Sequence, residues 1–296
     1  MRQAAQVTIS SPDKILYPEA KITKLEVAEF YRAIGAWMLP YLEGRPLTLV
    51  RCPTGYKGQC FYQKHVKPGT SELLTRVQVP EGAGFATYMS ADSTEAIVAL
   101  LQMGALEIHP WGSRVPHLDK PDIVIFDFDP DEGLGYAQVV EAATLMRQAL
   151  EQIGLRCFLK TTGGKGLHVV VPLQPTLPWN EVKAFTKAIA DSFAAGFPAK
   201  FTAKLAKASR GKKIFIDYLR NAEGATAIAP YSVRAKKNAP VATPIFWEEL
   251  KQDVRFDHFN IRNVPARLAR MKTDPWADFF TLRQKLTRAM LKSVGM

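Results

Sequence analysis

Apolar and polar residues along the first third of the chain follow the periods of helices and strands in turn. Thr23 and Glu26 form a capping box, and the apolar residues behind it recur at helical spacing until Pro40 ends the helix. The other elements predicted here are a strand at 46–53, a turn at 54–59, a short strand from 61, a helix capped at 92–95 that runs to about 102, and a strand at 105–110.

The rest of the chain interleaves strands with amphipathic helices. A run of apolar residues makes 122–128 the clearest strand. The elements predicted after it are a helix at 136–153 with Gly154 as its C-cap, a strand, glycine turn and strand within 155–173, a helix at 179–195, and strands at 212–219 and 227–234. The tail from Trp247 carries helices whose ends the pattern does not fix.

This mixture of hairpins and crossover helices predicts an α+β fold with a mostly antiparallel central sheet flanked by helices. A smaller N-terminal lobe of about 1–112 is expected to pack on a larger core of about 113–296, which holds most of the candidate chemistry. No stretch rich in Pro, Gly or Ser separates them, so residues 1–296 are predicted to form a single domain of two lobes.

Charge narrows the class of partner. Hydrophobic residues make up 47% of the 296 residues and charged residues 23%, which argues against a disordered chain or a coiled coil. Lys and Arg number 39 against 28 Asp and Glu, a net charge of +11. Such a balance favours nucleic acid, nucleotides or an anionic membrane surface as partners, without choosing among them.

The cysteines and the N-terminal sequence indicate the cellular compartment in which the protein is expected to work. Cys52, Cys60 and Cys157 form no C-x-x-C pair and no zinc-ribbon spacing, so they are expected to be ordinary thiols in a reducing compartment. The sequence shows no secretory signal and no run of 18 apolar residues. The expected location is a bacterial cytoplasm, in association with the nucleoid.

Asp127 and Asp129 are the first residues that suggest chemistry. Because side chains alternate along a strand, both carboxylates point to one face, roughly 7 Å apart. Like charges at that distance repel each other and resist loss of water. A divalent cation, Mg²⁺ or Mn²⁺, relieves both effects and prefers carboxylate oxygens. The alternative is a pair of solvated carboxylates at a strand end.

Asp217 is a third acid within an apolar strand, 212–219. If this strand pairs with 122–128, three carboxylates converge, as a two-cation nucleotidyl-transfer site requires. Taken alone, Asp217 is better explained as a hydrogen-bonded acid at a strand end.

Residues 161–168 read TTGGKGLH and form a glycine-rich turn between two strands. Glycines let backbone N–H groups approach phosphate oxygens, while Thr162 and Lys165 add a hydroxyl donor and a positive charge. His168 begins the next strand and presents a ring nitrogen to the same place. The spacing matches neither the Walker loop nor G-x-G-x-x-G. A hairpin turn with a surface lysine is the alternative.

Other residues are ambiguous on the sequence alone. Phe61 and Tyr62, beside Lys57 and Lys64, combine rings suited to base stacking with cations for phosphates, although core packing explains the rings equally well. The remaining candidates are basic residues or histidines near predicted strand ends or the first helix, where a structural or solvated role is the simpler explanation: Lys14, Lys24, Arg51, His109, Arg210 and Arg234.

Taken in order, these stretches resemble the polymerase domain of bacterial ATP-dependent ligase D, a branch of the archaeo-eukaryotic primase superfamily. The resemblance covers roughly residues 7–275. It is carried by SPDKILYPEAKITK, RPLTLVRCPTG, FYQKH, LEIHPWGS, DIVIFDFDP, KTTGGKGLHVVVPL, RGKKIFIDYLRN and PYSVRA. Each motif is a modest signal, whereas their joint order and spacing are highly specific.

The resemblance implies a primase-type catalytic core with an RRM-like sheet, and it implies roles for individual residues. Asp127, Asp129 and Asp217 would be the catalytic acids and would hold two divalent ions, Mn²⁺ or Mg²⁺. The residues implied to contact the nucleotide or its phosphates are Thr162, Lys165, His168, Arg51, His109, Arg210 and Arg234. Those implied to contact DNA are Lys14 and Lys24, at a 5′-phosphate, and Phe61 and Tyr62, at template bases. The family often has Ser where this chain has Thr162, and the hydroxyl is kept.

The function expected from this resemblance is template-directed nucleotidyl transfer that fills gaps and extends ends at DNA double-strand breaks in non-homologous end joining. It also implies use of ribonucleotides as well as deoxyribonucleotides, and Ku and the ligase and nuclease modules of the same pathway as partners. Two alternatives stay open on the sequence: an inactive module that binds DNA ends, and a stand-alone primase.

Overall fold

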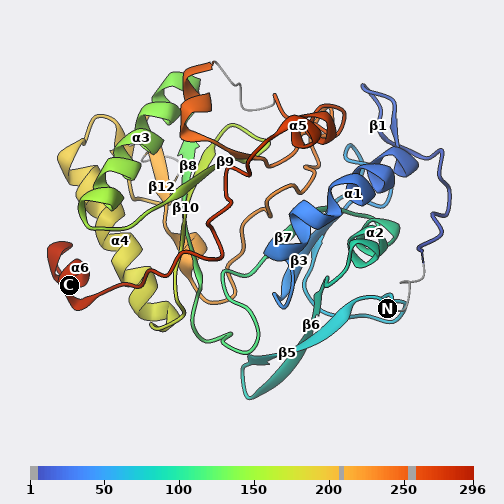
Figure 1. The fold of residues 1–296 in the computed structure, drawn as a ribbon, viewed down its shortest axis with the longest axis horizontal. Coiled ribbons are helices and arrows are strands. Elements are labelled where there is room, and N and C mark those ends of the chain that lie inside the picture. The colour runs from blue at the N-terminus through green and yellow to red at the C-terminus, as the bar shows by residue number, and fades with distance from the viewer. Residues whose placement is uncertain (1–5, 207–209, 253–257) are drawn as a thin grey trace. The chain divides into compact units, whose positions relative to one another are not determined.

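The computed structural model describes residues 6–206, 210–252 and 258–296 (Figure 1). The chain forms two compact units, and each is described by itself. The first comprises Met1–Val115, Ile228–Thr243 and Asp257–Lys272, and the second comprises Pro116–Ala227, Pro244–Phe256 and Thr273–Met296. The predicted N-terminal lobe ends close to the end of the first of these segments, while the sequence does not reveal the two later segments that return to the first unit. That both units form one domain stays a prediction.

The first unit contains a five-stranded sheet of order β4-β3-β6-β5, with β7 paired to β3, and a separate pair β1-β2. All of these strand pairs are antiparallel. The strands are β1 Ile15–Tyr17, β2 Ile22–Thr23, β3 Leu47–Arg51, β4 Phe61–Gln63, β5 Thr75–Glu81, β6 Gly84–Ser90 and β7 Ala105–Pro110. The helices are α1 Lys24–Met38, η1 Leu39–Tyr41, α2 Thr94–Gln102 and α5 Val264–Arg270.

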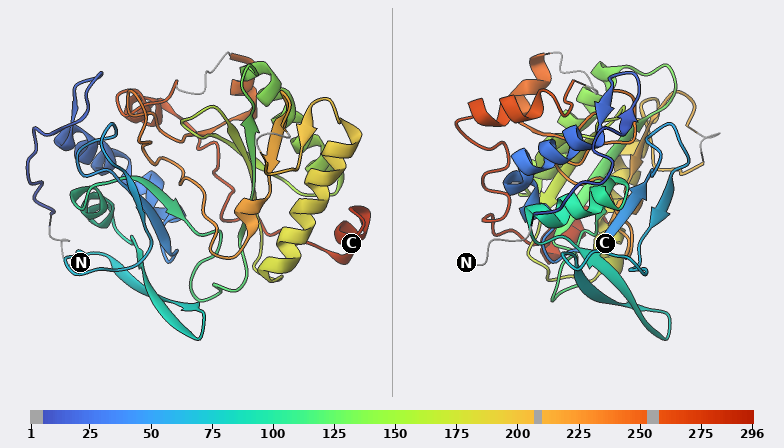
Figure 2. Two further views of the ribbon diagram at one scale, coloured as in Figure 1. Left: turned by 180° about the vertical axis from the view of Figure 1, so that it is seen from behind. Right: turned by 90° about the vertical axis from the view of Figure 1, so that its right-hand side faces the viewer.

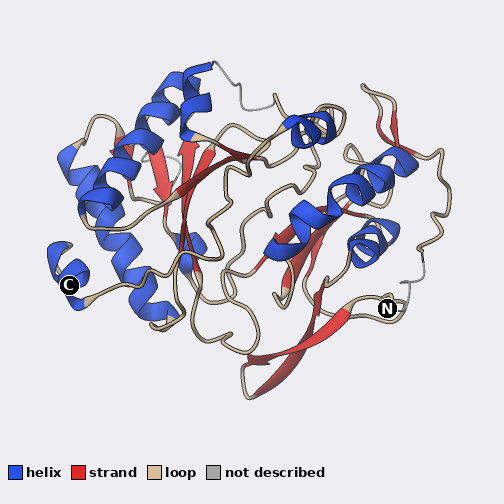
Figure 3. Ribbon diagram, viewed as in Figure 1, coloured by secondary structure: helices blue, strands red, loops and turns tan. Residues whose placement is uncertain are grey.

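The two long helices of this unit begin where the sequence predicts. The Thr23 hydroxyl accepts a hydrogen bond from the Glu26 N–H at 3.2 Å, and the Glu26 carboxylate accepts one from the Thr23 N–H at 2.7 Å, so the capping box is confirmed. Ser93 caps α2 in the same manner. α1 packs against α2, whose residues 96–101 are buried on nearly every side (Figure 3).

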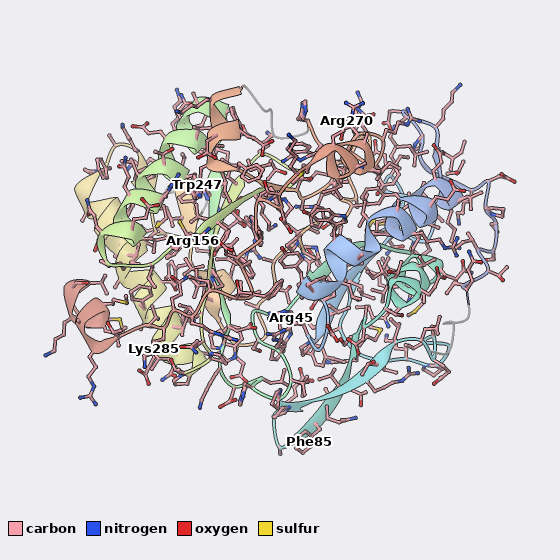
Figure 4. All side chains as sticks on the ribbon, in the orientation of Figure 1. Arg45, Phe85, Arg156, Trp247, Arg270 and Lys285 are labelled. Atoms are coloured by element: carbon pink, nitrogen blue, oxygen red, sulfur yellow. A yellow bond between two sulfur atoms is a disulfide. The ribbon has the colours of Figure 1, made fainter. Side chains whose placement is uncertain are left out.

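A long hairpin of β5 and β6, absent from the sequence-based prediction, extends beyond the other strands of this sheet (Figure 2). Phe85 lies near its turn and is 73% exposed (Figure 4).

The second unit is built on a six-stranded sheet of order β11-β12-β8-β10-β9-β13. Every neighbouring pair is antiparallel except β11 and β12. The strands are β8 Ile123–Pro130, β9 Phe158–Thr161, β10 Leu167–Pro172, β11 Phe201–Thr202, β12 Ile214–Asp217 and β13 Pro244–Ile245. The helices are α3 Tyr136–Gln152, α4 Trp179–Gly196, η3 Leu219–Asn221, η4 Trp247–Gln252 and α6 Arg288–Ser293.

Helices α3 and α4 lie along one face of this sheet (Figure 1). Phe126 and Phe128 alternate with Asp127 and Asp129 along β8, and both rings are fully buried. Since side chains alternate across a strand, the rings point toward the helices and the carboxylates toward the other face. The fold is therefore α+β with mostly antiparallel sheets flanked by helices, as predicted.

The strand predicted at 227–234 is wrong. Val233 forms only an isolated bridge with Val241, and no ladder follows. Tyr231 has a φ of 65°, a left-handed conformation that interrupts the pleat, directly after Pro230, which has no N–H to donate. The segment is instead tied to β7 at Ile108, whose carbonyl accepts from the Ala229 N–H and whose N–H donates to the Ser232 hydroxyl.

The prediction that all three cysteines are free thiols is wrong for two of them. Cys52 and Cys60 form a disulfide, while Cys157 is free and buried. The reason lies in strand register, because Arg51 of β3 pairs with Phe61 of β4 and thereby places the next residues outward, Cys52 and Cys60, opposite each other.

Among the described residues, no helix combines the length and the apolar character needed to cross a bilayer.

Candidate functional site

Asp127, Asp129 and Asp217 meet on adjacent strands of the second unit. β12 runs antiparallel beside β8, and Asp217 lies directly opposite Asp127. Each of the three residues offers a carboxylate oxygen, and these oxygens all lie within 4.8 Å of one another. The predicted convergence is thus confirmed, while the role of the acids as metal ligands stays a prediction.

A row of polar residues crosses the sheet at this level. In the strand register, Asp217 of β12 is opposite Asp127 of β8, Asp127 is opposite His168 of β10, and His168 is opposite Lys160 of β9. Directly opposed residues point to the same face, so the four side chains line one face of the sheet. All four are buried, with between 1% and 7% of each residue exposed.

Asp127 is the acid with the most positive surroundings. Its carboxylate lies 3.3 Å from Nε2 of His168 and 3.5 Å from Nε of Arg220. Burial alone would raise the pKa of Asp127, but His168, Arg220 and Lys160 outweigh burial and hold that pKa well below its usual range. Asp127 is therefore ionised throughout the neutral range.

The other two acids have the opposite tendency. Burial, and then the charges of Asp127 and Asp217, raise the pKa of Asp129 to about 6. Burial and the charge of Asp127 also raise the pKa of Asp217, even though Arg220 lies 3.2 Å from its carboxylate. Burial is the first cause of both shifts, so the fold disfavours the ionised form of these two carboxyls.

These residues fit a divalent cation. Hard cations such as Mg²⁺ and Mn²⁺ take carboxylate oxygens, and the oxygens of three carboxylates converge here. Burial, followed by the charge of Lys160, lowers the pKa of His168 to about 4, and the contact with Asp127 opposes that shift. Its Nδ1 is buried without a hydrogen-bond partner in the described structure, so it leaves a polar atom for a ligand to satisfy.

The glycine turn lies between β9 and β10 and is built as tightly as the sequence indicates. The Thr162 hydroxyl donates to the carbonyl of Gly166 at 3.1 Å and accepts from the N–H of Gly164 at 3.2 Å. A Cβ on Gly166 would lie 2.5 Å from the carbonyl oxygen of Phe128, so this position excludes any side chain. Lys165 is exposed in the turn. The two hydrogen bonds of the Thr162 hydroxyl thus hold the turn in shape, in addition to the role in phosphate binding that the sequence predicts for this hydroxyl.

Sequence reasoning missed two cations beside the acids. Lys160 lies on β9 directly opposite His168, so the pairing of the two strands around the predicted glycine turn could have placed the two residues together. Arg220 follows Asp217 by three residues within η3, and only the tertiary turn brings it onto the carboxylates. Arg210, which was predicted, packs over the Phe215 ring at 4.7 Å and lowers the pKa of Asp129 and Asp217, though less than burial raises it.

The first unit holds a separate cation-lined cavity of about 300 Å³. Three of the predicted residues line it, Lys14, Lys24 and Arg51. Burial, followed by the charge of Lys14, lowers the pKa of Lys24. No acidic residue is among those that line the cavity. The arrangement suits an anion.

The groups that hold these cations are neutral. The Lys24 ammonium donates to the Ser10 carbonyl at 3.1 Å and to the Gln102 side chain at 2.7 Å, and that of Lys14 donates to the Pro53 carbonyl at 2.6 Å. Nε of Arg51 donates to the Met103 carbonyl at 2.7 Å. Neutral partners fix the side chains and leave their charge for a ligand.

Phe61 and Tyr62 lie on β4, the strand that pairs with β3. Phe61 is 43% exposed and Tyr62 is 75% exposed, which excludes the core packing that the sequence left open. The Arg51 guanidinium lies 5.3 Å from the centre of the Phe61 ring. The aromatic pair and the cation-lined cavity are thus joined through Arg51.

His109 and Arg234 are brought together by a residue that the sequence did not single out, Glu107. One carboxylate oxygen of Glu107 lies 2.9 Å from Nε2 of His109, and the other accepts from Nε of Arg234 and the N–H of Ala235. Burial would raise the pKa of Glu107, but the contacts with His109, Arg234 and Ala235 lower it to about 2. A charged Glu107 therefore fixes the side chains of His109 and Arg234.

A mostly antiparallel sheet that carries convergent acids beside a glycine turn, in a chain with a second α+β unit, is the arrangement expected of primase-type polymerase domains. The chain belongs to the family described as LigD, primase-polymerase domain, whose sequence model matches residues 23–276. The resemblance seen in the sequence is confirmed.

Relatives and a solved structure agree with this family. The multifunctional non-homologous end joining protein LigD of Pseudomonas aeruginosa is 39% identical over 292 residues, which are 98% of this chain and 35% of that protein. That of Mycobacterium tuberculosis strain H37Rv is 33% identical over 273 residues, 90% of this chain and 36% of that protein. The chain therefore spans about a third of the length of these curated relatives.

The fold is similar to the polymerase domain from Mycobacterium tuberculosis ligase D, solved in complex with DNA. The TM-score is 0.87 at 32% sequence identity, and the match covers 93% of this chain and 98% of that one.

Proposed function

We propose that this chain is a template-directed nucleotidyltransferase that adds nucleotides to a 3′-hydroxyl at gaps and ends of broken DNA during non-homologous end joining. The observation that carries the proposal is the cluster of Asp127, Asp129 and Asp217, whose carboxylate oxygens lie within 4.8 Å, in a member of the LigD polymerase-domain family. A binding module without catalysis has no need of three convergent acids, two of them buried.

Asp127, Asp129 and Asp217 are the residues that would hold the cations. Two divalent ions, Mn²⁺ or Mg²⁺, supply charge neutralisation at the reacting phosphate and lower the pKa of the attacking hydroxyl. The protein's own part is to fix the acids. The pairing of β8 with β12 fixes the position of Asp127. His168 contacts one oxygen of its carboxylate and Arg220 contacts the other.

The incoming triphosphate would be bound by the glycine turn. Lys165 is exposed there, and the Thr162 hydroxyl and the turn's backbone are fixed by their mutual hydrogen bonds. His168 joins the turn to the acids through its contact with Asp127. We also propose Arg210, beside the acids, as a phosphate contact, and Arg51, His109 and Arg234 as nucleotide contacts following the family pattern.

DNA would be bound through the first unit. The cavity lined by Lys14, Lys24 and Arg51 suits a 5′-phosphate, because its cations are held by neutral groups. Phe61 and Tyr62 are exposed where template bases can stack on them. We propose that the protein uses ribonucleotides as well as deoxyribonucleotides, and that it works in the bacterial nucleoid with Ku and the ligase and nuclease modules of the pathway.

Primer extension by the double variant Asp127→Ala/Asp129→Ala tests the proposal. On a gapped duplex with Mn²⁺ and labelled nucleotide, the wild type extends the primer and the variant loses extension by at least about a thousandfold, since positioning and charge neutralisation supply nearly all of the catalysis. Binding of the same duplex, measured by fluorescence anisotropy, stays near wild type.

Asp131→Ala is the matched control, because Asp131 lies just past the same strand and outside the cluster. Extension by the double variant at the wild-type rate would refute the assignment. Absence of extension by the wild type, with intact binding of DNA, would leave the inactive end-binding module as the function. Synthesis without any primer would favour a primase.

A further inference from the structure

The disulfide of Cys52 and Cys60 has no part in the proposed transfer chemistry, yet it lies between two elements of the proposed DNA site. Cys52 directly follows β3, lines the cation-lined cavity and is fully buried. Cys60 directly precedes Phe61, the first residue of the aromatic pair, and is exposed. The bond therefore closes the base of the loop 53–59 at a point where the cavity and the aromatic pair meet.

This loop contributes directly to the cavity. The carbonyl of Pro53, the residue after Cys52, accepts the 2.6 Å hydrogen bond from the Lys14 ammonium. A change in the path of the chain at Cys52 thus moves the group that holds one of the three cavity cations. The same change reaches Phe61 through Cys60.

The far end of the loop is anchored without the disulfide. The Tyr56 hydroxyl donates to Glu19 at 2.6 Å, Lys57 forms an ion pair with the same carboxylate, and the rings of Tyr56 and Tyr17 stack at 5.3 Å. These contacts remain when the sulfur–sulfur bond is broken. They keep the two cysteines near each other, so the bond can form again.

The two sulfur atoms differ in the way that thiol–disulfide exchange requires. A small thiolate reaches Cys60 because this residue is exposed, and Cys52 is then the leaving group. Cys52 is displaced into a cavity lined by Lys14, Lys24 and Arg51, whose positive charges stabilise the leaving thiolate.

We propose that Cys52 and Cys60 form a reversible redox modification site that exchanges with a small thiol such as glutathione and sets the affinity of the neighbouring cavity for a DNA 5′-phosphate. In the reduction, one glutathione thiolate attacks Sγ of Cys60 and displaces Cys52. A second glutathione thiolate then releases Cys60, so two glutathione thiols become one oxidised glutathione and the cystine becomes two thiols. The oxidation is the reverse, with oxidised glutathione as the electron acceptor.

The expected consequence follows from preorganisation. The closed loop holds the Pro53 carbonyl and hence Lys14 in place, so the oxidised protein binds a phosphate without first ordering the cavity. The reduced protein has to order the loop on binding. This part of the proposal rests on the proposed function, since it takes the cavity to be the 5′-phosphate site.

The test equilibrates the full chain with mixtures of reduced and oxidised glutathione and makes two measurements. Maleimide mass-tagging under denaturing conditions counts thiols, and we expect a change from three in reducing mixtures to one, that of Cys157, in oxidising ones. Fluorescence anisotropy with gapped duplexes measures Kd, and reduction is expected to weaken binding of the 5′-phosphorylated gap by about three- to tenfold and that of the 5′-hydroxyl gap hardly at all.

Two variants sharpen the comparison. Cys60→Ser changes an exposed residue and is expected to bind like the reduced wild type in every mixture. Cys157→Ser is the matched control and is expected to respond like the wild type. Cys157 is buried, and burial raises the pKa of its thiol to about 12, so it does not exchange.

A cystine that resists every glutathione mixture, a pair that never forms, or equal Kd values for both redox states would each overturn the proposal. If neither state distinguishes the two gaps, the proposed phosphate site is wrong, and the coupling to it is overturned as well. In that case the thiol count alone still decides whether the pair exchanges.

Discussion

Asp129 and Asp131 are two residues apart at the end of one strand, yet their carboxyls are perturbed in opposite directions. Hydrogen bonds from backbone N–H groups, that of Lys212 foremost, lower the pKa of Asp131. Burial and the neighbouring acids raise the pKa of Asp129 to about 6. The fold accommodates an ionised Asp131 and disfavours an ionised Asp129.

The sign of this perturbation predicts how stability depends on pH. An acid whose pKa is raised by folding is bound to its proton more tightly in the folded state, so the folded protein loses stability as pH rises from about 4 through about 6. Asp129→Asn removes that loss. At pH 7.5 without divalent cations, the variant should melt a few degrees above the wild type, on the order of 1 kcal/mol, and the difference should vanish near pH 4.

Thermal melts at several pH values make the measurement, with Asp131→Asn as the control that gains nothing. Added Mn²⁺ should raise the Tm of the wild type more than that of Asp129→Asn, because the cation offsets the same repulsion. Equal melting temperatures for the wild type and Asp129→Asn at pH 7.5 would show that folding does not raise the pKa of Asp129.

At the scale of elements, the sequence predicts what local spacing determines. Helices α1 to α4 and strands β3, β7, β8, β9 and β10 follow from periodicity and caps close in sequence. The convergence of the acids depends on the pairing of β12 with β8, and the spacing of residues along the chain does not reveal that pairing. The same limit explains the errors, because register joins Cys52 to Cys60 and a single left-handed residue, Tyr231, breaks the strand predicted around it.

The candidate site divides in the same way, into local motifs that the sequence reveals and residues that only tertiary contacts place. The D-x-D pair and the glycine turn are local motifs, and the sequence alone reveals them. Glu107 and Arg220 were missed because their roles arise from partners on other elements, namely Arg234, 127 residues further along the chain, and Asp127. Acids and bases that act through tertiary contacts carry no local signature.

The close contact between the glycine turn and β8 predicts how a substitution at Gly166 displaces the start of β10. A Cβ at Gly166 would lie 2.5 Å from the Phe128 carbonyl oxygen, and that atom is backbone, so the start of β10 has to move away from β8. The shift carries His168 away from Asp127. Gly166→Ala should lose at least about 1 kcal/mol of stability, as overpacked sites do, and primer extension should fall at least about tenfold.

Gly196→Ala is the control for this change, because Gly196 lies in the same unit and a Cβ there meets nothing within 4 Å. Melting curves and extension rates of the two variants are compared with the wild type. Unchanged extension by Gly166→Ala would mean that the close approach of turn and strand has no bearing on the chemistry.

At the scale of the whole molecule, the proposed DNA binding would have two separable sources, the net charge of +11 and the cation-lined cavity. General charge attracts any phosphate backbone, releases counterions and makes binding weaken steeply with salt. If the cavity is the proposed 5′-phosphate site, it would contribute only when a terminal phosphate occupies it. Binding to gapped DNA should therefore have a part that ignores the 5′ end and a part that depends on it.

Lys24→Ala separates these two parts. Lys24 is only 8% exposed and its charge lies beside that of Lys14, so a bound phosphate gains a charge-assisted contact that the variant lacks. The variant should bind the 5′-phosphorylated gap about tenfold more weakly, with a salt slope smaller by about 1, and bind the 5′-hydroxyl gap like the wild type.

Lys187→Ala, which removes an exposed lysine paired with Asp191 in the second unit, should change neither Kd by more than about twofold. Anisotropy titrations at several salt concentrations give all of these values. A Lys24→Ala variant that loses affinity equally for both gaps would assign Lys24 to general charge and leave the cavity without its phosphate.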